Sequence, residues 1–538
     1  MRKLLSINNL KKYFPLPKSS LFQKEQLYVR ANEEISIDIY EGETFGLVGE
    51  SGCGKSTLGR VLLQLYNQTA GNTMYYGRTL EELSPKYVEQ TLSHAEEFID
   101  KYEKAKKAAE DREAECEKLG DNATFYDIQS KNLAVAEAQT ALDNVAKILG
   151  GFTVCDTKKG AALLLARYRV SVEMADIKSK LADIAIEKEF LSEDIKEREE
   201  GGKSASSDKK KIADLASKEK VLQAELETMQ AKLSEAEAKV AELKKVYEDN
   251  AEFARFEALL DDGIDLSRLT TNEMRFLRKD LQIIFQDPYS SLNPRMTVGQ
   301  IIEEGLITHK FFDRHSSGIK ASVFQTLQAC GLQNYMYNRY PHQFSGGQRQ
   351  RICIARSLAV KPKFIVCDEC VSALDVSIQS QIINLLLELK EKEKLTYLFI
   401  SHNLSVVRYI SDRIGVMYLG NMVEVAPTDV IFKDPRHPYT VALLSSIPTT
   451  DPDSLTKERI ILEGNIPSPI KPPSGCKFHT RCFMACEKCS RVPPPFVEIE
   501  PGHFVACHNL DRKIDDNGAY LFDVETHKNA DQREQNQN

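Results

Sequence analysis

The chain lacks an uninterrupted apolar stretch of the roughly 18 residues that a membrane-spanning helix needs. Its start, Met1 to Tyr13, also lacks the apolar core of a secretory signal peptide. There is no excess of positive charge, because 71 Lys and Arg residues stand against 79 Asp and Glu residues, for a formal net charge of −8. We therefore expect a protein that does not enter the membrane by itself and has no nucleic-acid partner, since nucleic-acid-binding chains are more often basic.

At 538 residues the chain is too long for one ordinary globular domain, so we expect several parts. Short apolar runs such as "LQIIFQD", "FIVCDE" and "TYLFISH" alternate with helical stretches, which predicts an α/β fold with a mostly parallel sheet flanked by helices. The predicted parts are residues 1–79 and 266–445 for the α/β domain, 80–265 for a helical insert, 446–512 for a cysteine-containing module and 513–538 for a polar tail.

The insert is rich in Ala, Glu, Lys and Leu, which is typical of long helices. A heptad pattern predicts an antiparallel coiled-coil hairpin with Gly201 to Asp208 near its tip, and only Glu219 interrupts the apolar seam. The downstream seam comprises Ile212, Leu226, Leu233 and Val240 at one position and Leu215, Leu222, Met229, Ala236 and Leu243 at the other; the upstream seam comprises Ile177, Leu181, Ile184, Leu191 and Ile195. The alternative is a single long solvated helix with accidental spacing.

A nucleotide-binding loop is predicted at "GESGCGKST", which follows a buried strand and precedes a helix. Glycines there let backbone N–H groups converge on phosphates, Lys55 supplies a positive charge, and Ser56 offers a hydroxyl to Mg²⁺. The predicted contacts are Gly49, Ser51, Gly52, Gly54, Lys55, Ser56 and Thr57. The alternative is a chance glycine-rich turn. We expect ATP and Mg²⁺ as the ligands.

Two carboxylates, Asp368 and Glu369, end the apolar run "FIVCDE". A buried strand would deliver both to its carboxyl end, beside the phosphate loop of such folds. We expect Asp368 to hold Mg²⁺ through water and Glu369 to polarise the water that attacks the γ-phosphate. Alone, the pair would be read as a solvated strand end; together with the loop it predicts an ATPase.

The segment "FSGGQRQR", which begins at Phe344, resembles the signature of the ATP-binding-cassette family. The resemblance implies a nucleotide-binding domain with a small antiparallel β part and a helical subdomain. It also implies a head-to-tail dimer, in which the phosphate loop of one subunit and the signature of the other enclose one ATP. The signature residues are Ser345, Gly346, Gly347 and Gln348. Glycine N–H groups and a serine at a helix start would form a second phosphate site.

Further positions match this family. Gln286 in "FQDP" resembles the glutamine that senses nucleotide and contacts Mg²⁺. Asp375 in "SALD" resembles the residue that contacts the other subunit of the dimer, and His402 in "FISHN" resembles the switch histidine. For adenine stacking, Tyr13 is the candidate that the resemblance implies, ahead of Phe14 and Tyr28. Two departures are the length of the insert and Cys370, where the family usually has proline. Because neither removes a reacting group, we expect activity to persist.

Within the family, "IFQDPYSSLNPRMTV" and "SALDVSIQSQIINLL" are similar to the ATPases of oligopeptide and dipeptide permeases, more to their F-type than to their D-type subunit. The resemblance covers about residues 4–76 and 266–508 and omits the insert. It implies a second, unlike ATPase subunit, two transmembrane permease subunits and an external peptide-binding protein. It also implies a peripheral position on the cytoplasmic face of the cell membrane. The partner of the insert stays unknown.

Five cysteines crowd near the end of the chain, where clustered cysteines of a cytosolic protein usually indicate a metal or cluster site rather than disulfides. "GCKFHTRC", "CEKC" and "VACH" resemble the closing motif of these permease ATPases. The resemblance implies a [4Fe-4S] cluster on Cys476, Cys482, Cys489 and Cys507, with Cys486 surplus. Tetrahedral zinc and reduced cysteines without a ligand are the alternatives.

The function expected is therefore ATP hydrolysis that powers uptake of oligopeptides through a membrane permease. The alternative is a non-transport ATPase of the chromosome-maintenance or DNA-repair kind with a mechanical coiled-coil arm. Net acidity, an arm that precedes Gln286 and the transporter-like closing motif oppose that alternative. A third hypothesis, compatible with the first, makes the hairpin a docking element for another helix.

Overall fold

The computed structural model describes residues 2–18, 26–120, 123–200, 206–313, 316, 318–447 and 460–510. The chain forms two compact units, one from residues 1–73 and 274–538, the other from residues 74–273. The predicted insert, residues 80–265, lies inside the second unit. The predicted polar tail, residues 513–538, lies outside the described residues. Within the described ranges no helix combines the length and the apolar character needed to cross a bilayer.

An eight-stranded sheet organises the first unit, in the order β11-β12-β10-β9-β3-β8-β7-β6. Five neighbouring strands are parallel: β9 (Arg413–Tyr418), β3 (Thr44–Val48), β8 (Thr396–Ile400), β7 (Phe364–Asp368) and β6 (Leu281–Ile284). The other three are antiparallel: β10 (Asn421–Pro427), β12 (His503–Val505) and β11 (Val497–Glu500). The central strands are buried over their whole length, as expected for parallel strands covered on both faces. This agrees with the predicted α/β class.

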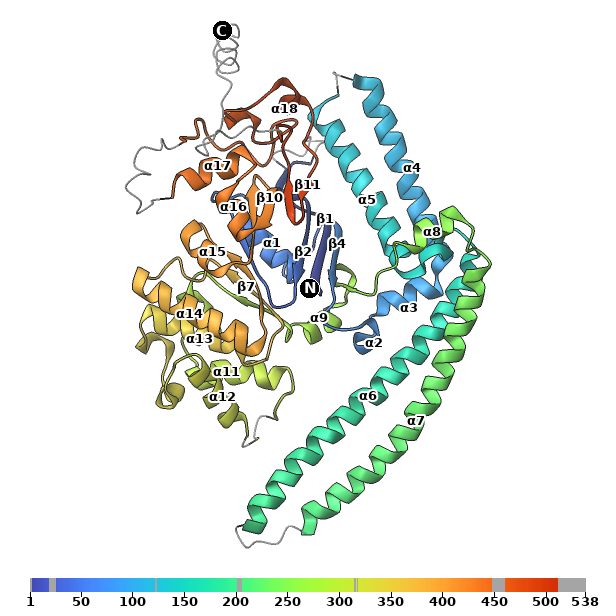
Figure 1. The fold of residues 1–538 in the computed structure, drawn as a ribbon, viewed down its shortest axis with the longest axis vertical. Coiled ribbons are helices and arrows are strands. Elements are labelled where there is room, and N and C mark those ends of the chain that lie inside the picture. Colours follow the sequence, from blue (N-terminus) through green and yellow to red (C-terminus); the bar gives the residue numbers. More distant parts are fainter. Residues whose placement is uncertain are drawn as a thin grey trace. The chain divides into compact units, whose positions relative to one another are not determined.

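Helices cover this sheet, and α11 to α14 gather in one region of the unit (Figure 1). A continuous apolar core joins them to the sheet through side chains such as Ile302, Ile352 and Phe399. The helices are α1 (Lys55–Leu62), α10 (Pro288–Ser291), α11 (Val298–Thr308), α12 (Gly318–Ala329), α13 (Gly346–Leu358), α14 (Val376–Glu393), α15 (Leu404–Ile410), α16 (Thr428–Lys433), α17 (Pro438–Ser445) and α18 (Glu487–Arg491). A further helix, α9 (Thr271–Leu277), crosses the boundary between the units.

A separate antiparallel pair, β1 (Lys3–Pro15) and β2 (Tyr28–Tyr40), belongs to the same unit. In β2 the alternate residues Ile35, Ile37 and Ile39 are buried, whereas β1 buries neighbouring residues such as Leu4 and Leu5, so both strands contribute to the core. The next strand in that sheet, β4 (Ala70–Tyr75), crosses the boundary between the units. Its last two residues pair with β5 (Ile264–Asp265) of the second unit.

The second unit is helical and has its own apolar core around Phe152, whose ring meets that of Phe253 edge-on at 5.5 Å. Two long helices, α4 and α5, lie side by side in it (Figure 1). The helices are α2 (Leu80–Leu83), α3 (Lys86–Ser93), α4 (Ala95–Leu119), α5 (Phe125–Leu149), α6 (Thr157–Glu200), α7 (Ser206–Lys245) and α8 (Ala251–Glu257).

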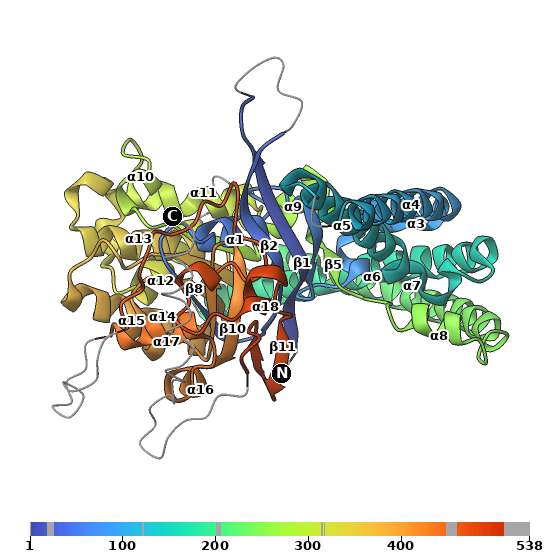
Figure 2. The same ribbon diagram turned by 90° about the horizontal axis from the view of Figure 1, so that it is seen from above.

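The longest helices, α6 and α7, also lie side by side, as both views show (Figures 1 and 2). Along α7 every residue of the predicted seam is buried or half-buried, whereas Val221, off the seam, is 68% exposed. Glu219, the polar residue of the seam, accepts a hydrogen bond of 2.7 Å from Lys188 of α6. The structure therefore has two helices where the alternative expected one. Of the predicted tip, residues 201–205 lie outside the described residues and Ser206 to Asp208 begin α7.

Candidate functional site

Four parallel strands end at one edge of the sheet, and the predicted site follows from this. The phosphate loop comes after β3, Asp368 and Glu369 lie at the end of β7, His402 follows β8 and Gln286 follows β6. Because β3, β8, β7 and β6 are neighbours in that order, their carboxyl ends converge. Residues more than 300 positions apart in the sequence, such as Ser56 and Asp368, thus come within hydrogen-bonding distance of each other.

The phosphate loop requires glycine at two places where the backbone lies close to other chain segments. Gly49 has φ +150°, and a Cβ there would lie 2.2 Å from the carbonyl oxygen of Met417. Gly54 has φ +103°, and a Cβ there would lie 2.1 Å from the carbonyl oxygen of Ala31. Both distances are shorter than any real contact, so no other residue fits. The loop then leads directly into α1, which begins at Lys55.

Lys55 is buried, and its ammonium group donates to the carbonyl oxygens of Gly49 at 2.8 Å and Glu50 at 3.0 Å. The loop backbone therefore holds the charge inside the curve of the loop, where phosphates bind in such loops. One residue further, the Ser56 hydroxyl donates to Asp368 Oδ1 at 2.6 Å. Arg60, which the sequence analysis did not single out, places its guanidinium 3.6 Å from Asp368 Oδ2.

These oxygen ligands fit Mg²⁺, which prefers carboxylate, hydroxyl and amide oxygens. Ser56 and Asp368 are in direct contact, and the Gln286 amide lies beside the adjoining Glu369. When bound with ATP, Mg²⁺ neutralises charge on the phosphates. The chemistry of this donor set is therefore compatible with the expected ion.

The Glu369 carboxylate lies between two polar side chains from neighbouring strand ends. Gln286 Nε2 donates to Glu369 Oε2 at 2.8 Å, and His402 Nδ1 lies 3.5 Å from the same oxygen. Glu369 also has φ +50°, an uncommon conformation for a residue with a side chain. Such backbone strain is found at functional sites, where the surrounding structure enforces it. The arrangement directs one carboxylate at the edge where the phosphate loop lies.

The signature segment begins a helix. Ser345 is the N-cap of α13, and its hydroxyl oxygen accepts from Gln348 N at 3.3 Å while the Gln348 side chain accepts from Ser345 N at 3.2 Å. Gly346 and Gly347 form the first turn of this helix, so their N–H groups lie at its positive end. Asp375 likewise caps α14, where its carboxylate accepts from Ile378 N at 3.0 Å.

Tyr13, expected to stack on adenine, is only 4% exposed and donates a hydrogen bond from its hydroxyl to Glu33. Burial, and then the Glu33 charge, raise the pKa of Tyr13 well above its usual value. Its ring therefore has almost no free face. Phe14 and Tyr28 are half-buried, and the Phe14 ring meets that of Tyr66 edge-on at 5.4 Å.

The cysteine module does not present a preformed metal site. Within the described ranges, no three or more His, Cys, Asp or Glu side chains are placed to hold a metal ion, although Cys486 Sγ lies 3.4 Å from Cys489 Sγ. Burial raises the pKa of Cys482 to about 12 and that of Cys489 to about 11. A bound metal would itself deprotonate its thiol ligands, so it is the spacing of the described side chains, which are not gathered around a common centre, that does not fit a cluster or zinc.

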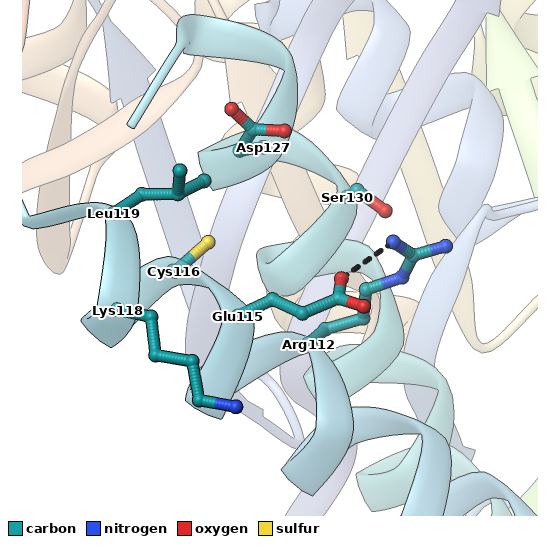
Figure 3. Close-up of a pocket in the computed structure, with 7 residues that line it drawn as sticks. All are labelled: Arg112, Glu115, Cys116, Lys118, Leu119, Asp127 and Ser130. Carbon is teal, nitrogen blue, oxygen red and sulfur yellow. Dashed lines mark hydrogen bonds and ion pairs between the residues drawn. The ribbon is translucent and has the colours of Figure 1, made fainter. Parts of the chain in front are cut away.

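A pocket of about 290 Å³ lies between the ends of α4 and α5 (Figure 3). Its main polar feature is an exposed ion pair of 2.8 Å between Arg112 and Glu115. Cys116 and Asp127 also face it. None of the residues that line this pocket belongs to the predicted nucleotide site.

Comparison with known proteins bears on the family of the chain. The family model described as "ABC transporter" matches residues 32–261 and 256–372, and the model described as "Oligopeptide/dipeptide transporter, C-terminal region" matches residues 423–489. "Oligopeptide transport ATP-binding protein AppF" of Bacillus subtilis is 53% identical over 252 residues, which cover 46% of this chain and 76% of AppF. "Putative oligopeptide transport ATP-binding protein YkfD" of the same organism is 53% identical over 247 residues, 46% of this chain and 75% of YkfD.

Solved structures are more distant. The ADP conformation of MJ1267, an ATP-binding cassette of an ABC transporter, is 14% identical, with a TM-score of 0.40 over 83% of this chain and 100% of that chain. The assignment therefore rests on the sequence comparisons, which confirm the resemblance inferred from the motifs. By its family model and its relatives, the chain belongs to the ATPases of the ABC transporter family.

Proposed function

We propose that this chain powers the uptake of oligopeptides through a membrane permease by binding and hydrolysing ATP. The match of residues 423–489 to the C-terminal region of oligopeptide and dipeptide transporters carries the proposal, because that region lies outside the general ATPase motifs. The names of the relatives point the same way. They disfavour the alternative of a mechanical arm acting on DNA.

For the reaction we assign roles by geometry. Lys55 and the loop N–H groups would bind the β- and γ-phosphates, while Ser56, Gln286 and Asp368 would hold Mg²⁺, which supplies positive charge at the phosphates. Glu369 orients and polarises the attacking water, which needs a carboxylate positioned near the γ-phosphate. The hydrogen bond from Gln286 to Glu369 Oε2 and the approach of His402 to the same oxygen support this role, since they orient the carboxylate.

We propose a head-to-tail dimer with a second, unlike ATPase subunit. Ser345, Gly346, Gly347 and Gln348 at the positive end of α13 would contact the γ-phosphate of the ATP on the partner's loop, and Asp375 would contact the partner. Two transmembrane permease subunits and an external peptide-binding protein complete the assembly. The chain would then be peripheral, on the cytoplasmic face of the membrane. For adenine stacking, burial disfavours Tyr13, and we propose Phe14.

Two further parts of the chain carry smaller proposals. We propose that α6 and α7 form a coiled coil that is not part of the motor, because the polar seam residue Glu219 already has its partner, Lys188, within the hairpin. Deleting residues 82–262 with a short Gly-Ser linker should then leave ATP turnover and uptake intact, and loss of either in a folded variant would contradict it. Retained activity leaves docking of a further, unknown protein as the role to pursue.

The four cysteines of the closing motif, Cys476, Cys482, Cys489 and Cys507, would gather around an iron-sulfur cluster only after rearranging, with zinc as the alternative. Anaerobic purification followed by iron and zinc analysis tests this. The proposal expects bound metal that is lost in Cys482→Ser and kept in Cys486→Ser, the matched control. Absence of bound iron and zinc in the wild-type protein would contradict the proposed metal site.

Partner identification tests the main proposal. The full chain carrying Glu369→Gln, purified from detergent-solubilised membranes with Mg-ATP, should remain in the closed dimer because hydrolysis is blocked. Mass spectrometry should then find two multi-span membrane proteins and a second ATPase. Glu391→Gln, an exposed glutamate of α14, is the control and should recover less of the closed assembly. Recovery of only soluble or DNA-associated proteins would overturn the proposal.

A further inference from the structure

The cysteine module contacts the phosphate loop directly through one arginine. Arg481, which precedes Cys482, donates from Nη1 to Glu50 Oε2 at 2.8 Å and from Nη2 to Glu50 Oε1 at 3.2 Å. The Arg481 side chain is 7% exposed and that of Glu50 is 23% exposed. Two parallel N–H···O bonds of this kind fix the orientation of both groups. Glu50 is the second residue of the loop, directly after Gly49.

The segment that carries Arg481 is anchored in the core of the same unit. Phe478 is buried, with its ring 5.1 Å from that of Tyr418 and 5.3 Å from that of Tyr439. The Tyr439 hydroxyl in turn accepts a hydrogen bond from Glu50 N at 2.8 Å. The backbone and the side chain of Glu50 are thus held by two residues of the C-terminal half. The position of Arg481 is set by packing, so the pair does not depend on a mobile side chain.

A carboxylate in a phosphate loop is electrostatically unfavourable, because the loop must accept the negative charges of ATP. The Glu50 backbone carbonyl binds the Lys55 ammonium group, so the acid belongs to the same turn as the cation that contacts phosphate. Unpaired, Glu50 would repel the phosphates and compete for Lys55. Paired with a guanidinium in a partly buried place, its charge is largely cancelled.

We propose that Arg481 is a positioning residue for ATP binding, which cancels the charge of Glu50 and holds it away from the phosphates. The C-terminal module thereby completes the nucleotide site and is not only an appendage to it. A purely structural clip is the competing explanation. The two differ in what removal of Glu50 does, because a clip is broken by losing either partner, whereas repulsion disappears when the acid is removed.

The test is equilibrium binding of MgATP, MgADP and adenosine to the full chain, for Arg481→Gln, Arg481→Lys, Glu50→Gln and the double variant Arg481→Gln/Glu50→Gln. Charge cancellation predicts that Arg481→Gln weakens MgATP binding on the order of tenfold, MgADP binding less and adenosine binding hardly at all. Glu50→Gln should bind MgATP at least as well as wild type, and the double variant should return to within about threefold of it. Arg481→Lys keeps the charge but loses the two parallel bonds, so it should weaken MgATP binding less than Arg481→Gln does.

A matched control is Arg436→Gln, which removes an arginine that pairs with Asp434 and Glu500 outside the loop and should leave all three affinities unchanged. Equal losses in Arg481→Gln, Glu50→Gln and the double variant, or a loss that is the same for adenosine and MgATP, would overturn the proposal. If Arg481→Gln does not fold, Glu50→Gln alone decides: tighter or equal MgATP binding supports charge cancellation, and weaker binding refutes it.

Discussion

Val240 of α7 offers a quantitative test of how the second unit is built. The side chain is 4% exposed and belongs to the core around Phe152. Val240→Ala removes the equivalent of two buried methylene groups, at about 0.8 kcal/mol each, and leaves a small cavity. We therefore expect the free energy of unfolding to fall by about 2 kcal/mol.

The matched control is Val221→Ala on the same helix, because Val221 is 68% exposed and loses almost no contacts. We expect it to change the free energy of unfolding by less than about 0.5 kcal/mol, with a small gain from the higher helix propensity of alanine. Urea unfolding of the full chain, followed by far-UV circular dichroism, gives both values from the shift of the main helical transition. Equal destabilisation by the two substitutions would refute the burial pattern of α7.

Three further predictions concern Glu219 of the coiled-coil seam, the aromatic residue that stacks on adenine, and Cys370. Glu219→Leu should destabilise the second unit by about 1 kcal/mol because Lys188 loses its partner in a half-buried place, and adding Lys188→Leu should restore at least that amount in urea unfolding. Phe14→Leu should weaken ATP binding in calorimetry more than Tyr13→Leu does, since each substitution removes one aromatic ring, and the reverse order would return the stacking role to Tyr13. The protein with its natural Cys370 should hydrolyse ATP. A phosphate-release assay of the assembled complex that finds no turnover would contradict this.

The parts of the site that the sequence made predictable share one property. Lys55, Asp368 and His402 each lie at or after the end of a strand recognisable by its apolar run, and parallel strands bring their carboxyl ends to one edge. The heptad spacing of α7 was equally readable, because a period of seven is local information. Contacts between residues far apart in the sequence could not be read in this way, and the residues near Glu50 illustrate this.

Arg481 and Glu50 are 431 positions apart, and nothing in "HTRC" marks its arginine as a partner of the phosphate loop. The burial of Tyr13 could not be predicted from the sequence either. Neighbouring strand residues face opposite sides, and only the pairing with β2 decides which ring turns inward. The pairing of Lys188 with Glu219 depended in the same way on the register of two helices.

Peptide uptake driven by ATP hydrolysis is the central claim, and a transport assay measures it most directly. Cells that depend on this chain would be given a labelled oligopeptide, with the chain present as wild type, Glu369→Gln or Glu391→Gln at matched expression. We predict uptake with wild type and with Glu391→Gln, and a loss of at least about a hundredfold with Glu369→Gln, since the carboxylate that polarises water is gone. Undiminished uptake with Glu369→Gln, or no dependence of uptake on the chain at all, would contradict the account.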